Sequence, residues 1–191
     1  MGHDTFERDY WGDCTNTFDE EQKHYTYARY MGIPQVGYAF DARGKSVLDI
    51  GGGPVSMLLK CKNVRGSFVI DPLVESYPPW VIDRYGTKGI ACQAWRGEDV
   101  QEAFLEAPFD EAWIYNVLQH TDDPAKVIEN AKAVAPVLRI FEWVDIPPHE
   151  GHPHMLTVPT LQEWIGARGN VVQLNERGCT GRAFYGCFRH R

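Results

Sequence analysis

A run of three glycines, from Gly51 to Gly53, follows directly on a short apolar strand that we predict over residues 45–50. Pro54 begins a short helix predicted over 55–60, because proline lacks only an N–H that the first helical turn does not need. Glycine allows a sharp turn and a close approach of the backbone to a ligand. Open α/β sheets bind ligands at such a place, where a strand ends at its carboxyl side. Taken alone, the pattern leaves open a ligand-binding turn and a plain tight turn.

Strands and helices alternate along the rest of the chain. Strands are predicted at 45–50, 67–71, 91–95, 111–117, 137–144, 171–174 and 183–188. Helices are predicted at 18–31, 55–60, 80–84, 99–105, 124–134 and from residue 160 onward. This alternation predicts a parallel sheet covered by helices on both faces. The last two strands have no helix between them, so we expect them to pair antiparallel.

Residues that cap helices set the expected helix starts. Thr17 and Glu20 form the pattern of a capping box in front of the helix over 18–31, and Gly32 ends that helix. Thr160 and Glu163 repeat the pattern for the last helix. We therefore predict that each of the two helices begins just after its threonine.

Size and charge narrow the classes of protein that fit. The chain has 191 residues and a mass of 21.8 kDa, the size of one domain, and we treat it as a single domain. Its net charge of −7 argues against a protein whose main task is binding nucleic acid, for which a basic surface is expected. No run approaches the roughly 18 apolar residues of a membrane span. The sequence sets no expectation for the oligomeric state.

The cysteines and the N-terminal segment bear on the compartment. The five cysteines are an odd number and contain no C-x-x-C pair, which predicts free thiols and argues against a disulfide framework or a four-thiolate zinc site. The first residues are charged and lack the apolar core of a signal peptide. We therefore expect a cytoplasmic protein.

An acidic residue strengthens the interpretation of the glycine turn as a ligand site. Asp71 ends the next strand, 18 residues after Gly53, where a carboxylate can accept hydrogen bonds from both ribose hydroxyls. The dinucleotide pattern G-x-G-x-x-G is not met, because Ser56 stands at its third glycine. Asp49, just before the glycines, would repel a phosphate but suits a cation. S-adenosylmethionine, with its ammonium and sulfonium groups, is a nucleoside ligand of that kind.

At this point the sequence resembles class I S-adenosylmethionine (SAM)-dependent methyltransferases. The segment 47–53 is similar to their first motif and 68–71 to their second, and 109–124 resembles their fourth strand and the loop after it. Many members carry a third glycine where this chain has Val55. The resemblance runs from about residue 45 to the C-terminus. It implies a three-layer sandwich around a seven-stranded, mostly parallel sheet with an antiparallel last strand.

The resemblance also implies which residues hold the cofactor. These are Asp49, Gly51 and Gly53 for the methionine part, Asp71 for the ribose, Glu98 or Asp99 for the adenine, and Asn116 for the floor of the pocket. Residues 45–191 would form the SAM-binding core and 1–44 an N-terminal helical cap. The aromatic residues of that cap leave open whether it closes over the cofactor as a lid or packs on the sheet as an amphipathic helix.

Histidines are the candidates for removing a proton from the acceptor of the methyl group, because their pKa lies near neutrality. His120 follows the fourth strand, and His149 and His152 lie in a loop after the fifth. A structural role in a loop is the alternative for each of them. The cluster from His149 to His154 also has donors that suit a divalent metal, but the spacing favours the non-metal interpretations.

These observations predict a methyltransferase that uses SAM on a small-molecule acceptor, through oxygen or nitrogen rather than carbon. We expect no metal and no nucleic-acid or membrane partner. A non-catalytic SAM-binding module is the alternative. A nicotinamide-dependent oxidoreductase is disfavoured by the missing third glycine and by the absence of a Tyr-x-x-x-Lys pair.

Overall fold

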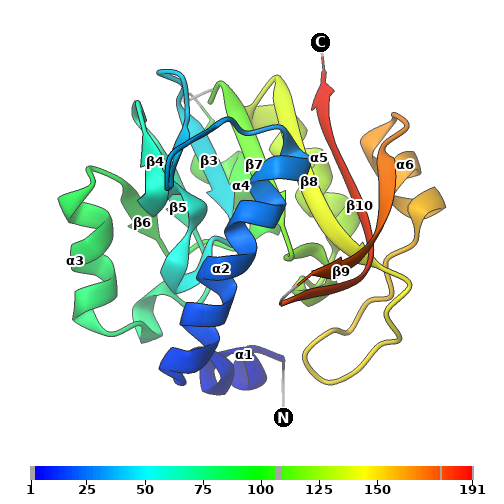
Figure 1. Cartoon of the computed structure of the whole chain (residues 1–191), viewed down its shortest axis with the longest axis horizontal. Helices are drawn as coiled ribbons and strands as arrows, with labels where there is room; N and C mark the ends of the chain where they lie inside the picture. The colour runs from blue at the N-terminus through cyan, green and yellow to red at the C-terminus, as the bar shows by residue number, and fades with distance from the viewer. Residues whose placement is uncertain (1–2, 106–108, 177, 191) are drawn as a thin grey trace.

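Seven strands form the central sheet of the computed structural model, which describes residues 3–105, 109–176 and 178–190 (Figure 1). Residues 1 and 2 of the predicted cap lie outside the described part. The strand order is β6-β5-β3-β7-β8-β10-β9. The strands are β3 (Val47–Ile50), β5 (Phe68–Ile70), β6 (Ala91–Gln93), β7 (Glu111–Tyr115), β8 (Val137–Val144), β9 (Asn170–Glu176) and β10 (Cys179–Arg189). Strands β3, β5, β6, β7 and β8 are parallel, and β10 pairs antiparallel with both β8 and β9. The predicted sheet, with its antiparallel last pair, is confirmed.

Helices cover both faces of the sheet, so the predicted three-layer arrangement is also confirmed. The helices are α1 (His3–Trp11), α2 (Cys14–Met31), α3 (Pro79–Thr87), α4 (Val100–Ala103), α5 (Pro124–Val134) and α6 (Val158–Ile165). Side chains of α2 and α3 pack in one apolar cluster and those of α4, α5 and α6 in another. Among the described residues, no helix is long and apolar enough to span a membrane.

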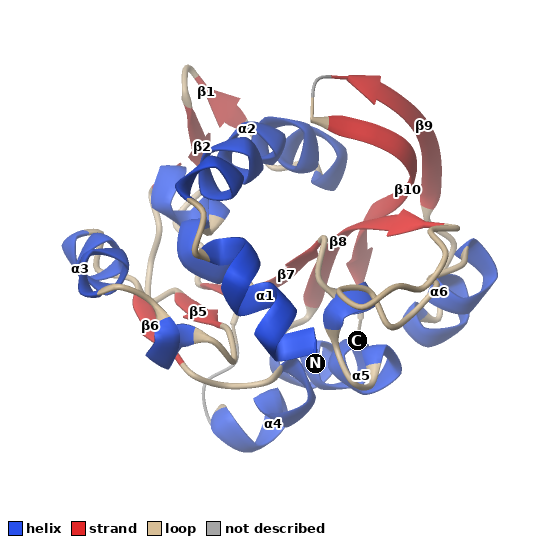
Figure 2. Cartoon of the chain, turned by 90° about the horizontal axis from the view of Figure 1, so that it is seen from below, coloured by secondary structure: helices blue, strands red, loops and turns tan. Residues whose placement is uncertain are grey.

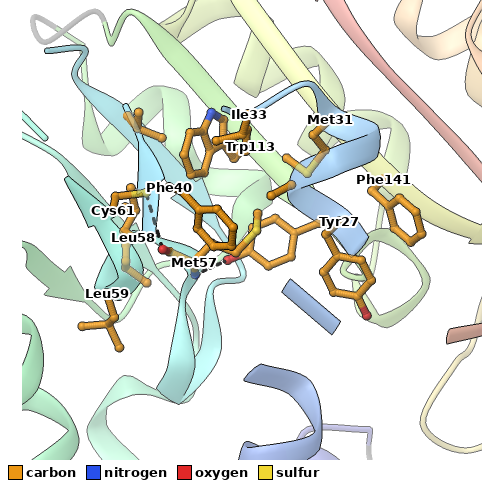
Figure 3. Close-up of a cluster of buried hydrophobic side chains, with 14 of the residues drawn as sticks. Tyr27, Met31, Ile33, Phe40, Met57, Leu58, Leu59, Cys61, Trp113 and Phe141 are labelled. Carbon is orange, nitrogen blue, oxygen red and sulfur yellow. Dashed lines mark hydrogen bonds between the residues drawn. The ribbon is translucent and has the colours of Figure 1, made fainter. Parts of the chain in front are cut away.

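Strand alternation divides the core between the two faces. Along β3, Leu48 and Ile50 join the cluster with α5, whereas Val47 joins the cluster with α2. The α2 cluster is rich in aromatic rings: Tyr27 lies 4.7 Å from Phe141 between ring centroids (Figure 3). Large rings bury much apolar surface, so this face fixes α2 on the sheet.

The N-terminal aromatic residues differ in what they contact. Tyr27 and Tyr30 of α2 pack on the sheet, against Phe141 and Tyr185. Trp11 of α1 instead lies over the glycine turn. The structure thus contains both a packed helix, α2, and a separate helix, α1, at the edge of the sheet.

Both predicted capping boxes are wrong in position. Helix α2 begins earlier, at Cys14, because the side chain of Asp13 accepts a hydrogen bond from the Thr15 amide at 2.8 Å. Helix α6 begins at Val158, because Thr157 is its N-cap and accepts from the Thr160 amide at 3.3 Å. A capping oxygen further upstream was available in each case. Helix α5, by contrast, begins at Pro124 as predicted, and Asp123 caps it by accepting from the Lys126 amide at 3.0 Å.

The short helix predicted over 55–60 is broken into two 3-10 turns, η1 (Gly53–Val55) and η2 (Met57–Lys60). Ser56 between them is extended, with ψ at 145°. Its hydroxyl donates to Asp49 and accepts from the Leu58 amide, which holds the backbone out of a continuous helix. The other predicted helices are present as α3, as η4 (Gly97–Asp99) followed by α4, as α5 and as α6.

The structure also contains elements whose bounds were not predicted. These are α1, the short strands β1 (Gln35–Val36), β2 (Ala39–Asp41) and β4 (Cys61–Lys62), and the 3-10 turns η3 (Val74–Ser76) and η5 (Leu118–His120). The three short strands form a small separate sheet. The cysteines whose side chains are described, Cys61, Cys92, Cys179 and Cys187, are free thiols as predicted.

A buried ionic network ties the parallel strands to α2. Glu111, at the start of β7, accepts from Arg139 of β8 at 2.7 and 3.0 Å, and Lys45 also donates to it. Arg139 continues to the Met31 carbonyl at the end of α2. Burial raises the pKa of Glu111, but these bonds outweigh it and hold the pKa at about 2.

Replacing Glu111 with glutamine is expected to lower the free energy of unfolding by about 3 kcal/mol at neutral pH, because it leaves the buried Arg139 without its charge partner. The depressed pKa of Glu111 means that its stabilisation is present above its ordinary value and lost as pH falls toward 2. Urea unfolding at neutral pH and at about pH 3 measures the difference, which should shrink in acid. The control Glu176→Gln breaks an exposed pair with Arg29 and should cost about 0.5 kcal/mol. An equal loss in both variants would contradict this account.

Candidate active site

A cavity of about 450 Å³ opens at the edge of the sheet where the parallel strands end. Its walls come from α1, the start of α2, the segments that follow β3, β5, β6, β7 and β8, and the turn between β9 and β10. Figure 2 looks onto this edge, with α1 lying across it. Residues distant in sequence therefore meet in one chamber, at the place where open α/β sheets bind ligands.

Gly51 lies in the wall of the cavity in the left-handed conformation, with φ at +69°. A Cβ there would lie 2.6 Å from a methyl group of Val117, so the position has no room for a side chain. Gly53 is also left-handed, at φ +61°, but it is buried and is not part of the cavity wall. Trp11 of α1 covers it. Of the two predicted glycines, Gly51 alone faces the chamber.

Asp49 lies beneath the turn rather than in the cavity wall. It is fully buried and accepts a hydrogen bond from the Tyr115 hydroxyl at 2.6 Å, in addition to the one from Ser56. Burial raises its pKa to about 7, although both hydrogen bonds act to lower it. Its Oδ1 atom has no hydrogen-bond partner among the described residues. Asp49 thus supports the glycine turn from below, with one acceptor atom left over.

Asp71 lines the cavity and is held rigidly. Its Oδ1 accepts from the Tyr77 hydroxyl at 2.7 Å and the Leu73 amide at 2.9 Å, and its Oδ2 from the Gly53 amide at 3.2 Å. Burial raises its pKa, and these three hydrogen bonds partly offset that. A carboxylate has about four acceptor positions, so one remains for a ligand. The predicted ribose acid is therefore oriented at the chamber before any ligand arrives.

The acids after β6 separate in the structure. Glu98 lines the cavity and accepts from the amides of Asp122 and Asp123 at 2.9 and 3.0 Å. Asp99 is not part of the cavity wall. The structure thus brings Glu98, and not Asp99, to the chamber with Asp71.

Asn116 forms part of the chamber wall after β7, in the left-handed conformation at φ +57°. Its side-chain oxygen accepts from Gln119 at 3.0 Å, and its backbone N–H donates to the Phe141 carbonyl at 2.9 Å. These bonds hold the turn after β7 in a fixed shape.

The three predicted histidines meet at the cavity. His120 lies in η5, and its ring centroid is 4.4 Å from that of His152, which in turn is 4.2 Å from that of His149. His149 and His152 are paired by two backbone hydrogen bonds of 2.9 Å. Burial and the neighbouring histidines lower the pKa of His152 to about 4, so that ring is neutral near pH 7. Among the described residues, no group of three or more His, Cys, Asp or Glu side chains is arranged to hold a metal ion.

Sequence reasoning missed Glu142, which organises the loop that carries His120. Glu142 is fully buried in β8 and accepts from the amides of Val117 and Leu118 at 3.0 and 3.2 Å. Burial raises its pKa to about 7, and those two amide hydrogen bonds partly offset it. An acid between the apolar residues Phe141 and Trp143 of β8 was the available signal.

A second polar group, formed by Lys23 and Glu20, lines the same cavity near the turn between β9 and β10, away from Asp71. Lys23 of α2 forms an ion pair with Glu20 at 2.9 Å, and both side chains line the cavity. Trp143 of β8 and Thr180 of β10 line it as well. Because β5 and β10 lie on opposite sides of β7 in the sheet, the chamber has two ends with different chemistry. The sequence offered no signal that these residues belong together.

Several solved structures with the same fold are methyltransferases. The 1,6-didemethyltoxoflavin-N1-methyltransferase of Burkholderia thailandensis, with 1,6-didemethyltoxoflavin and S-adenosylhomocysteine (SAH) bound, aligns with a TM-score of 0.64 at 20% identity, over 98% of this chain and 86% of that one. The N-methyltransferase NodS of Bradyrhizobium japonicum WM9 aligns with a TM-score of 0.57 at 18% identity, over 90% and 96%. A SAM-dependent methyltransferase of Aquifex aeolicus aligns with a TM-score of 0.52 at 19% identity, over 88% and 96%.

Neither a protein-family model nor a curated protein gives a significant match to this sequence. The likeness to the first two of these structures extends over 98% and 90% of this chain. The chain therefore has the fold of the class I methyltransferases.

Proposed function

We propose that this protein transfers a methyl group from SAM to an oxygen or nitrogen atom of a small-molecule acceptor. The observation that carries the proposal is the placement of Asp71, held by three hydrogen bonds at the wall of a chamber beside a glycine turn. The fold that carries this arrangement is shared with methyltransferases, which supports the proposal.

The residues of one end of the chamber fit the parts of SAM. Gly51 offers a wall without a side chain, at the one position where a Cβ would strike Val117. Asp71 would hold the ribose, Glu98 would face the adenine, and Asn116 would form the floor. We assign Gly53 and Asp49 to the support of the turn, because neither lines the chamber. When bound, SAM supplies a methyl group on a sulfonium, ready for displacement by an aligned nucleophile.

The other end of the chamber supports a small acceptor with both polar and flat apolar surface. Trp143 provides an indole ring, while Lys23 and Glu20 provide a charge of each sign. The toxoflavin methyltransferase with the same fold binds 1,6-didemethyltoxoflavin. We propose that the acceptor of this chain is likewise a flat heterocycle, and that His120 accepts its proton.

Turnover tests the proposal directly. The protein is incubated with SAM and a set of hydroxylated and amino-substituted heterocycles, and mass spectrometry follows both SAH and the gain of one methyl group. Formation of SAH together with a methylated product supports the proposal. Binding of SAM without any methylated product would instead identify a non-catalytic SAM-binding module, and binding of NADH in its place would identify an oxidoreductase.

Replacing Lys23 with methionine is expected to raise the KM for the acceptor by about 10- to 100-fold, since a hydrogen bond to a charged group contributes about 1.5–3 kcal/mol. The affinity for SAH should stay within about twofold, because Lys23 lies at the other end of the chamber from Asp71. Steady-state kinetics and calorimetry measure the two quantities. The control is Lys126→Met, which removes an exposed lysine paired with Glu129 and should change neither. A loss of SAH affinity in the Lys23 variant would refute this division of the chamber.

A further inference from the structure

A carboxylate of the N-terminal helix contacts the candidate base across the chamber. Oε1 of Glu7 lies 2.9 Å from Nδ1 of His120, with the two side chains 15% and 19% exposed. Glu7 belongs to α1 and His120 to η5, and both line the cavity. The contact therefore joins helix α1 to the loop that follows β7.

Contacts on either side of Glu7 hold α1 in this position. Phe6 packs on Gly151, where a Cβ would lie 2.3 Å from the ring. At the end of the helix, Trp11 lies over Gly53, 3.6 Å from the position of an added Cβ. The helix is thus docked on the histidine loop through one aromatic ring and on the glycine turn through the other. Glu7 lies between these two contacts.

The surroundings of His120 favour one tautomer. A carboxylate beside Nδ1 favours a proton on that nitrogen. The side-chain amide nitrogen of Gln119 lies 3.4 Å from Nε2, and an amide N–H there favours a lone pair on Nε2. Both neighbours agree on a ring with its lone pair at Nε2. That form of the ring can accept a proton, and the long Gln119 contact is easily displaced.

Charged and titratable groups reach His120 from every element packed against it. Glu7 comes from α1, and Glu142 from β8. His152 and His149 face it from the loop after β8. Burial acts to lower the pKa of His120, but the contact with Glu7 outweighs it and leaves the pKa above its ordinary value, with a smaller contribution from Glu142.

We propose that Glu7 is a positioning residue for His120, and that helix α1, which lies across the chamber, holds Glu7 at the site. The inference rests on the proposed function. As the acceptor atom takes the methyl group from the sulfonium, its proton passes to Nε2 of His120, which leaves a neutral thioether and an imidazolium beside the Glu7 carboxylate. The docked helix thus both covers the chamber and completes the base, so proton removal is strongest when the site is closed.

The first test needs neither cofactor nor acceptor. The titration of His120 is followed by NMR in the protein, in Glu7→Gln and in Asp9→Asn, a matched loss of charge at an exposed position of the same helix outside the cavity wall. We expect Glu7→Gln to lower the pKa of His120 by about one pH unit. Asp9→Asn should leave it unchanged. An unchanged His120 titration in Glu7→Gln would overturn the proposal.

The second test separates this inference from the proposed function. In Glu7→Gln, the Kd for SAH should stay within about twofold, the KM for the acceptor should hold, and kcat should fall by about 10- to 100-fold. The acidic limb of kcat/KM against pH should move down with the NMR titration, and Glu7→Asp should recover part of the rate. A fall in kcat without a shift of that limb would overturn the role of Glu7. If wild-type protein forms no methylated product while its His120 titration depends on Glu7, the proposed function fails and the pairing stands.

Discussion

Replacing Asp71 with alanine is expected to weaken SAH binding by about 10- to 100-fold. The substitution removes the carboxylate that we assign to the ribose, and each hydrogen bond to a charged acceptor contributes about 1.5–3 kcal/mol. It also frees the amides of Gly53 and Leu73 and the hydroxyl of Tyr77, which Asp71 now fixes. Isothermal calorimetry with SAH measures the loss, and thermal unfolding shows whether the variant is folded.

Two further variants sharpen the interpretation of that loss. Asp71→Asn keeps the shape and one oxygen of the side chain but removes its charge, so its affinity should fall between those of wild type and alanine. Asp99→Ala removes a neighbouring acid that is not part of the cavity wall, and it should bind SAH as the wild type does. A folded Asp71→Ala protein that binds SAH with wild-type affinity would exclude Asp71 from the cofactor site.

Replacing Gly51 with alanine is expected to lower the free energy of unfolding by about 2–5 kcal/mol and to weaken SAH binding in the same protein. The left-handed backbone at φ +69° costs an L-residue about 1–2 kcal/mol. The added methyl would lie 2.6 Å from Val117, and relieving such overpacking costs about 1–3 kcal/mol. Both groups face the chamber, so the adjustment disturbs its wall. Urea unfolding and calorimetry measure the two effects.

A double-mutant cycle separates the two causes in Gly51→Ala. Adding Val117→Ala removes the methyl groups that the new Cβ would strike and leaves the backbone cost in place. The double variant should therefore be destabilised less than the sum of the single variants, by about 1–3 kcal/mol. Strict additivity would show that the contact with Val117 does not limit this position.

The sheet was predictable because its signals are local. Strand β3 is a short, mostly apolar run that is followed by Gly51, and β5 is one that is followed by Asp71. The absence of a helix between the last two strands predicted their antiparallel pairing. Asp71 was predictable for the same reason, since the end of a strand fixes which edge of the sheet it reaches. The helix starts were less accurate, because Asp13 and Thr157 compete with Thr17 and Thr160 as caps, and their relative placement is set by the chain around them.

Which of the predicted residues line the chamber and which only support the glycine turn could not be predicted, because this depends on the tertiary structure. Strand alternation turns Asp49 toward the sheet face that α2 covers, where the Tyr115 hydroxyl donates a hydrogen bond to it. No local sequence pattern predicts that Tyr115 is the partner of Asp49. Gly53 is covered by Trp11 from α1, whose position within the predicted N-terminal cap no local pattern determined. Glu7 reaches His120 from 113 residues away in the chain, so a pattern of neighbouring residues could not pair them.

The measurement that tests the central claim most directly is a calorimetric titration of the purified protein with SAH, run beside NADH. The account predicts that SAH binds with a Kd in the micromolar range, about −8 kcal/mol, and that NADH does not bind. That result would establish the ligand of the glycine turn and of Asp71. Binding of NADH, or failure of the folded protein to bind SAH at millimolar concentration, would contradict the account.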